Sequence, residues 1–123
     1  LEKIEADFRK ADSELDFNAC VQRNRSFVEH LLKYCAVLVA NKRGENPKPE
    51  WEGPGGAGQV RAYLNSQTFL SDTLHKLCAA FYGFASDQGS HQLSTKREVA
   101  RIVKNINIEL ALLLLRRVET FLK

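Results

Sequence analysis

The densest run of apolar residues lies near the C-terminus, where six consecutive residues, from Leu110 to Leu115, are apolar. A helix that packs on one core needs an apolar stripe only about 100° wide, so this run covers every direction around the helix axis. It is too short to span a bilayer, which takes about 20 apolar residues. We therefore expect this helix to be packed on more than one side, either within a bundle or against another chain.

Helical spacing extends this segment towards the N-terminus, to a capping-box sequence at residues 95–98. In such a box Thr95 and Glu98 each accept a hydrogen bond from the other's backbone amide, which predicts a helix start at about Lys96. The positions predicted to face inward are Val99, Ile102, Val103, Ile106, Leu110, Leu113 and Leu114.

Two further apolar patterns follow each other in the first part of the chain. The first has the 3-4-3-4 spacing of a coiled-coil seam, at Leu1, Ile4, Phe8, Ala11 and Leu15. This spacing of apolar residues is interrupted at residues 16–18, where Asp16 and Asn18 are good helix-cap residues. Two interpretations stay open: a kink near Asp16–Asn18, or one helix of about 42 residues, about 63 Å long. The long helix would expose its seam and need a partner helix.

A segment rich in Gly and Pro separates this pattern from the next. Residues 44–58 contain five Gly and all three Pro, which predicts a flexible loop. Trp51 either folds back from this loop onto the bundle or is displayed as an anchor for a partner. Residues 59–83 form a third helical pattern, and no strand pattern competes anywhere. We predict one all-α domain over residues 1–123, an antiparallel bundle of three long helices, or four if the first is kinked.

Composition fits this picture. The chain has 123 residues, of which 44% are hydrophobic and 27% charged, as in ordinary globular domains. It contains no Met, which favours a domain excised from a longer protein. The net charge of +3 is mixed along the chain and too small to predict a nucleic-acid partner, and we expect no membrane partner.

The three cysteines are odd in number and lack C-x-x-C spacing. They fall within apolar helical patterns at Cys20, Cys35 and Cys78. This arrangement predicts buried reduced thiols rather than metal ligands, and hence an intracellular protein, cytoplasmic or nuclear.

The strongest catalytic candidate lies between residues 23 and 30, where Arg23, Arg25 and His30 resemble the Arg…His signature of HEPN-type helical ribonucleases. The resemblance implies an acid/base role for His30 and stabilisation of phosphate charge by arginine. A solvated helix face explains the same residues without chemistry. We identify no other catalytic pattern, metal site or cofactor site. A nucleic-acid-binding bundle is a further alternative, based on the basic pairs Lys42-Arg43, Lys96-Arg97 and Arg116-Arg117.

Two stretches of the chain resemble one known family. Residues Leu1–Phe17 resemble the N-terminal helix of the spindle and kinetochore-associated protein 2 family, and Leu77–Gln88 is compatible with its second helical region. Together they cover about a quarter of the chain. The resemblance implies a non-enzymatic protein whose helices bundle with two sister subunits in a microtubule-binding complex. The Gly/Pro-rich segment and the apolar run 110–115 depart from the family's pattern and suggest a more self-contained domain.

Surplus apolar surface is the observation on which the functional hypothesis depends. We predict a non-catalytic helical module for protein–protein interaction, which binds an amphipathic partner helix or forms a homodimer. The residues expected at the partner surface are Phe8, Leu15, Trp51, Leu112, Leu115 and Phe121.

Overall fold

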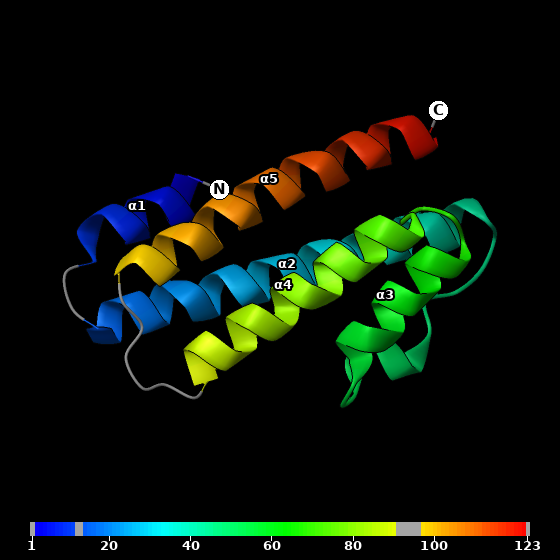
Figure 1. The fold of residues 1–123 in the computed structure, drawn as a ribbon. Coiled ribbons are helices and arrows are strands. Elements are labelled where there is room, and N and C mark those ends of the chain that lie inside the picture. Colours follow the sequence, from blue (N-terminus) through cyan, green and yellow to red (C-terminus); the bar gives the residue numbers. More distant parts are fainter. Residues whose placement is uncertain (1, 12–13, 91–96, 123) are drawn as a thin grey trace.

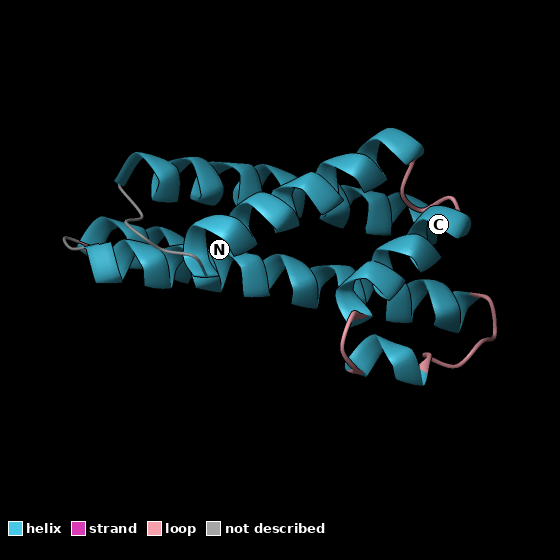
Figure 2. Ribbon diagram, turned by 60° about the horizontal axis from the view of Figure 1, so that its bottom comes forward, coloured by secondary structure: helices cyan, strands magenta, loops and turns pink. Residues whose placement is uncertain are grey.

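Regular structure in this chain is helical. The computed structural model describes residues 2–11, 14–90 and 97–122, with the side chains of all of these except 14, 15 and 85–90. Figure 2 shows the described helices and the loops that join them. In chain order the elements are α1 (Glu2–Lys10), α2 (Glu14–Lys42), the 3₁₀-helix η1 (Pro49–Glu52), α3 (Gly56–Ser66), α4 (Asp72–Ser90) and α5 (Arg97–Leu122). The predicted all-α class is confirmed.

The central helix is α2, which contacts each of the other four described α-helices. Its most extensive contact is with α5. The two helices run parallel, because Asn24 bonds to Asn107 and, further along both helices, Lys42 bonds to the carbonyl of Phe121. Figure 1 shows α4 and α1 running in the opposite direction, with α1 beside the N-terminal half of α5. The core therefore lies around α2, between α4 and α5.

One polar pair is embedded in the contact between α2 and α5. Asn24 is 2% exposed and Asn107 is 0% exposed. Nδ2 of Asn107 donates to Oδ1 of Asn24 at 2.6 Å, and Nδ2 of Asn24 donates to the carbonyl oxygen of Cys20 at 2.7 Å. Buried amide groups are costly unless they are paired, so this contact favours a single register between the two helices.

The first helical break lies earlier than the sequence indicated. Because α2 already begins at Glu14, residues Asp16 to Asn18 lie in its first turns rather than at a kink. An acidic side chain is also favourable in a first turn, where it faces the positive end of the helix dipole, so the same residue types fit both interpretations. Ile4 and Phe8 of α1 are buried against α2 and α5, and the long overhanging helix is therefore excluded.

The third helical pattern, residues 59–83, belongs to two helices. Between α3 and α4, Thr68 adopts a left-handed φ of 61°. The hydroxyl of Ser71 accepts a hydrogen bond from the backbone amide of Leu74, at 3.1 Å, and so caps the start of α4. Phe69 and Leu70 are buried within the break, so the apolar spacing continues through it and hides it.

The Gly/Pro-rich segment 44–58 contains η1 and the first turn of α3. Trp51 is 5% exposed, and its ring lies 5.0 Å from that of Tyr63. The backbone at Gly56 passes so close to the backbone of Trp51 that a Cβ on residue 56 would lie 2.3 Å from the carbonyl oxygen of Trp51. Trp51 thus folds back onto the bundle and anchors the middle of the segment that the sequence predicted as a flexible loop.

The last helix, α5, is described from Arg97 to Leu122, and its predicted start at about Lys96 lies outside the described residues. Thr95 and Lys96, which belong to the expected capping box, lie outside the described residues.

Candidate functional site

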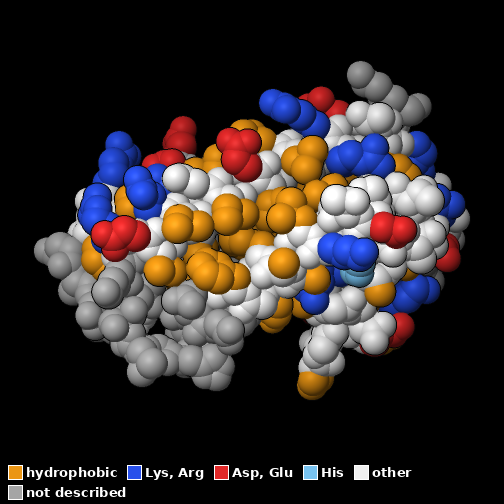
Figure 3. All heavy atoms as spheres, in the orientation of Figure 1, with side chains coloured by type: hydrophobic (Ala, Val, Ile, Leu, Met, Phe, Trp, Pro, Cys, Tyr) orange, Lys and Arg blue, Asp and Glu red, His pale blue; other side chains and the backbone are white. Residues whose placement is uncertain are grey.

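An apolar groove of about 510 Å³ lies between α4 and α5. These helices meet over a much smaller contact than α2 and α5 do, so side chains between them stay uncovered. The apolar lining comes from one residue of α4 and four of α5: Leu77, Ile106, Leu110, Leu112 and Leu113. Asn105, Glu109 and Arg116 add polar groups. Figure 3 shows apolar side chains gathered in a band across this face, with charged side chains beside it.

The run of apolar residues in α5 creates this groove. Successive residues of a helix are rotated by about 100°, so they cannot all face α2. Leu110 and Leu114 are buried, whereas Leu112 and Leu113 are 39% and 38% exposed. Ile102, which was predicted to face inward like Leu113, is also exposed. In the described structure this part of α5 is therefore packed on one side and open on the other.

Three of the residues expected at a partner surface pack within the chain instead. Phe8 is 6% exposed, because α1 folds back and carries its ring to 4.6 Å from Nζ of Lys104 on α5. Trp51 is buried against α3, as described above. Phe121 packs edge-on against Phe69, with ring centroids 5.8 Å apart. Within the described chain, Phe8 and Trp51 are therefore buried and Phe121 is half-buried.

The three leucines expected at a partner surface differ from one another. Leu112 lines the α4–α5 groove. Leu115 is 41% exposed on the same helix but does not belong to the groove lining. The side chain of Leu15 lies outside the described residues.

Sequence reasoning missed Leu77, which is 48% exposed on α4. The residues of α4 that face the core, Cys78 and Phe81, already form a buried stripe. Leu77 precedes Cys78 by one position and is therefore rotated by about 100° away from it. In the sequence, Leu77 belongs to the third helical pattern together with Leu74, Cys78 and Phe81, so the spacing gave no signal that its side chain would be exposed.

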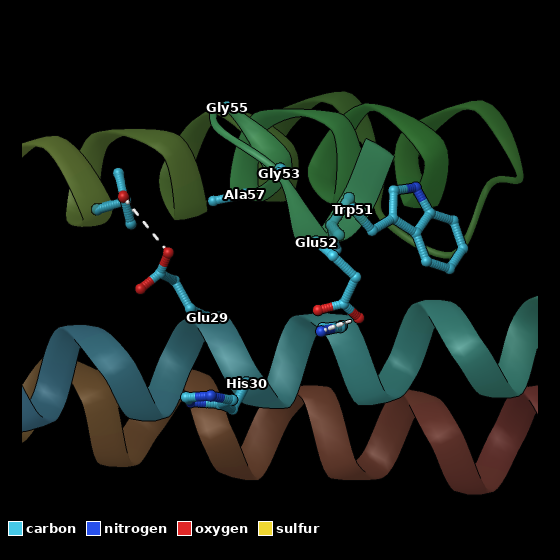
Figure 4. Close-up of a pocket in the computed structure, with 11 residues that line it drawn as sticks. Glu29, His30, Trp51, Glu52, Gly53, Gly55 and Ala57 are labelled. Carbon is cyan, nitrogen blue, oxygen red and sulfur yellow. Dashed lines mark hydrogen bonds and ion pairs between the residues drawn. The ribbon is translucent and has the colours of Figure 1, made fainter. Parts of the chain in front are cut away.

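A polar pocket of about 270 Å³ lies between α2 and the segment formed by η1 and α3. Figure 4 shows the carboxylates of Glu29 and Glu52 reaching into it from α2 and η1. Glu29 accepts a hydrogen bond from the hydroxyl of Tyr82 at 3.4 Å, and Glu52 pairs with Lys33. His30 donates from Nδ1, at 2.8 Å, to a backbone carbonyl one turn earlier in its own helix. These polar groups thus serve contacts within and between the helices.

The residues of the ribonuclease-like pattern have three different neighbours. Nη1 of Arg23 bonds to Oδ2 of Asp7 on α1 at 3.0 Å. The guanidinium carbon of Arg25 lies 5.9 Å from the centre of the Tyr82 ring on α4. His30 lines the polar pocket. Of the three residues, His30 belongs to the pocket lining, whereas Arg23 contacts α1 and Arg25 contacts α4.

Three cations of the basic pairs bond to backbone carbonyl groups. Arg117 donates two hydrogen bonds, at 3.0 and 3.2 Å, to carbonyl oxygens in the break between α3 and α4, and Arg43 donates a third at 3.3 Å. Lys42 donates to the carbonyl of Phe121 near the end of α5. Lys96 lies outside the described residues. These cations satisfy carbonyl groups that helix ends leave open.

The cysteine thiols Cys20, Cys35 and Cys78 are buried and form no disulfide. Burial raises the pKa of all three, to about 12 for Cys35 and to about 11 for Cys78. The thiolate is the nucleophilic and metal-binding form, so these residues act as small core side chains at neutral pH. Across residues 2–11, 14–90 and 97–122, no group of three or more His, Cys, Asp or Glu side chains is placed to hold a metal ion. None of the described helices has the length and apolar character that a membrane span requires.

In comparisons with known proteins, no family model, no curated protein and no solved structure matches this chain. The functional argument therefore depends on the geometry of the described residues, and foremost on the α4–α5 groove.

Proposed function

We propose that this chain is a non-catalytic protein-interaction module whose α4–α5 groove binds an amphipathic helix. The observation that carries the proposal is the groove itself, with its volume of about 510 Å³ and its exposed Leu77, Leu112 and Leu113. Apolar side chains gathered over two helices, rather than scattered singly, are typical of an interaction site. A helix is the best-fitting ligand, because its anchors at i, i+3, i+4 and i+7 suit a groove between two helices.

Two further observations favour this proposal. Arg23, His30 and Arg117, which belong to the patterns that suggested a nuclease or a nucleic-acid surface, form hydrogen bonds within the chain. The resemblance to the spindle and kinetochore-associated protein 2 family also points to assembly, because Leu77 belongs both to the resembling stretch and to the groove. We propose an intracellular setting, cytoplasmic or nuclear, since the buried thiols carry no disulfide.

A displayed library of amphipathic helical peptides tests this function. Peptides are selected against the wild-type chain held at low density on beads, and binding of a labelled peptide is then measured by fluorescence anisotropy. Leu113→Glu brings a carboxylate into the groove, so we expect the Kd of the peptide to rise at least about tenfold, as for loss of an interface anchor. Leu115→Glu is the matched control, because it makes the same change on the same helix outside the groove lining.

Circular dichroism serves as the folding control, and both variants should keep the helix content of the wild type. Equal binding of the selected peptides to the two variants contradicts the proposal. So does a selection in which no peptide binds the wild-type chain above background.

A further inference from the structure

Two opposite charges in the groove have a spacing that suits a second copy of this chain. Glu109 and Arg116 are exposed on α5, and both line the groove. They are two helical turns apart, about 10.5 Å along the axis, on one face of the helix. That separation is too large for an ion pair within α5. Among the described residues, neither side chain belongs to any of the ion pairs. Both charges are therefore exposed beside the apolar lining, where a docked partner would meet them.

Leu112 and Leu113 lie midway between these charges. A two-fold axis through this midpoint lays two α5 helices antiparallel, with Leu112 and Leu113 of both copies at the centre. The same rotation brings Glu109 of one copy opposite Arg116 of the other, and it does so twice. A surface that is complementary to itself in this way is what a closed dimer requires, and such dimers are the commonest protein oligomers.

The alternatives fit the charges less well. A parallel arrangement of two copies would align Glu109 with Glu109 and Arg116 with Arg116, and like charges at an interface oppose association. An unrelated helix would need its own acidic and basic residues at the matching spacing, whereas a second copy carries them already.

We infer that the α4–α5 groove is the contact surface of an antiparallel, two-fold symmetric dimer of this chain. The dimer is centred on Leu112 and Leu113 and oriented by two ion pairs between Glu109 and Arg116. Leu77 of α4 then forms the flank of the groove beside the incoming helix. This inference rests on the proposed function, because it names the occupant of the same groove.

Charge reversal tests the inference, with dimerisation measured by sedimentation equilibrium at low salt. Glu109→Arg and Arg116→Glu each replace two attractive contacts by two repulsive ones, so each variant alone should dimerise at least about tenfold more weakly than the wild type. An equimolar mixture of these two variants should dimerise as tightly as the wild type, because the heterodimer has opposite charges at both contacts. Glu50→Arg, the same change at an exposed position on η1, should leave the Kd unchanged.

The inference is overturned if the wild-type chain stays monomeric up to millimolar concentration. It is also overturned if single reversals leave the dimer intact, or if the mixture stays as weak as its components. The peptide experiment separates this failure from failure of the proposed function. If the chain is monomeric but binds the selected peptides through Leu113, only the dimer inference is rejected. If it is monomeric and binds no peptide, both the dimer inference and the proposed function are rejected.

Discussion

The buried amide pair between α2 and α5 allows a quantitative test of how these helices are joined. Asn107→Leu keeps the branched heavy-atom skeleton but removes the donor that Oδ1 of Asn24 accepts at 2.6 Å. Asn24 is 2% exposed, so water cannot replace this donor. An unpaired buried acceptor costs about 1–3 kcal/mol. Oδ1 of Asn107 itself has no described partner, so its removal offsets part of that cost. We expect the free energy of unfolding to fall by about 1–2 kcal/mol.

Replacing the other member of the pair, Asn24, should lower the free energy of unfolding further. Asn24→Leu leaves both polar atoms of Asn107 unpaired at a site that is 0% exposed, and we expect a loss of about 2–4 kcal/mol. The double variant leaves neither amide in the core, and replacing both partners by apolar groups of similar shape is nearly neutral. It should therefore lie within about 1 kcal/mol of the wild type, with a coupling energy above about 2 kcal/mol.

Urea unfolding followed by circular dichroism measures all four proteins. Asn41→Leu, at an exposed position near the end of α2, is the control and should stay within about 0.5 kcal/mol of the wild type. If the double variant loses as much stability as the two single variants combined, Asn24 and Asn107 do not act as a pair.

Two further changes probe the segment around Trp51. Gly56→Ala should lower the free energy of unfolding by about 1–3 kcal/mol, because its Cβ would lie 2.3 Å from a backbone carbonyl oxygen. Gly58→Ala meets nothing closer than 3.8 Å and should raise stability by up to about 1 kcal/mol, so shifts of the same sign in urea unfolding would refute this reasoning. Burial, with the hydrogen bond to Glu45, raises the pKa of Tyr63 from 10.0 to about 12. The unfolded phenol ionises first, so stability should fall as the pH rises from 10 to 12. Tyr63→Phe should flatten this slope in urea unfolding at stepped pH, and an unchanged slope would show that Tyr63 does not cause it.

Local periodicity predicted those features of the fold that local pattern determines. Val103, Leu110 and Leu114 of α5 are buried as their spacing indicates. Ile102 was expected inward as well and is 45% exposed. The reason is that α5 carries more apolar residues than its neighbours can cover. A sequence shows how many such residues a helix has, but not how many helices will lie against it.

Contacts between distant segments could not be read from the spacing. Phe8 is buried because α1 folds back onto α5, where Lys104 pairs with Glu5 at 3.2 Å across 99 positions of sequence. The groove has the same origin, because Leu77 reaches α5 only after the chain has reversed direction. One signal was available and overlooked. The cap residue Ser71, followed by an acidic residue, marks the start of α4 and divides the predicted third helix.

The parallel pairing of α2 with α5 has a consequence for biosynthesis. On the ribosome, α2 is complete long before α5, its largest contact, has been translated. Translation adds about 5–20 residues per second, so the nascent chain waits for seconds with one side of α2 uncovered. During that interval it is a natural client for molecular chaperones. A premature stop codon within the 26 residues of α5 would make this transient state permanent and yield a product prone to aggregation and degradation.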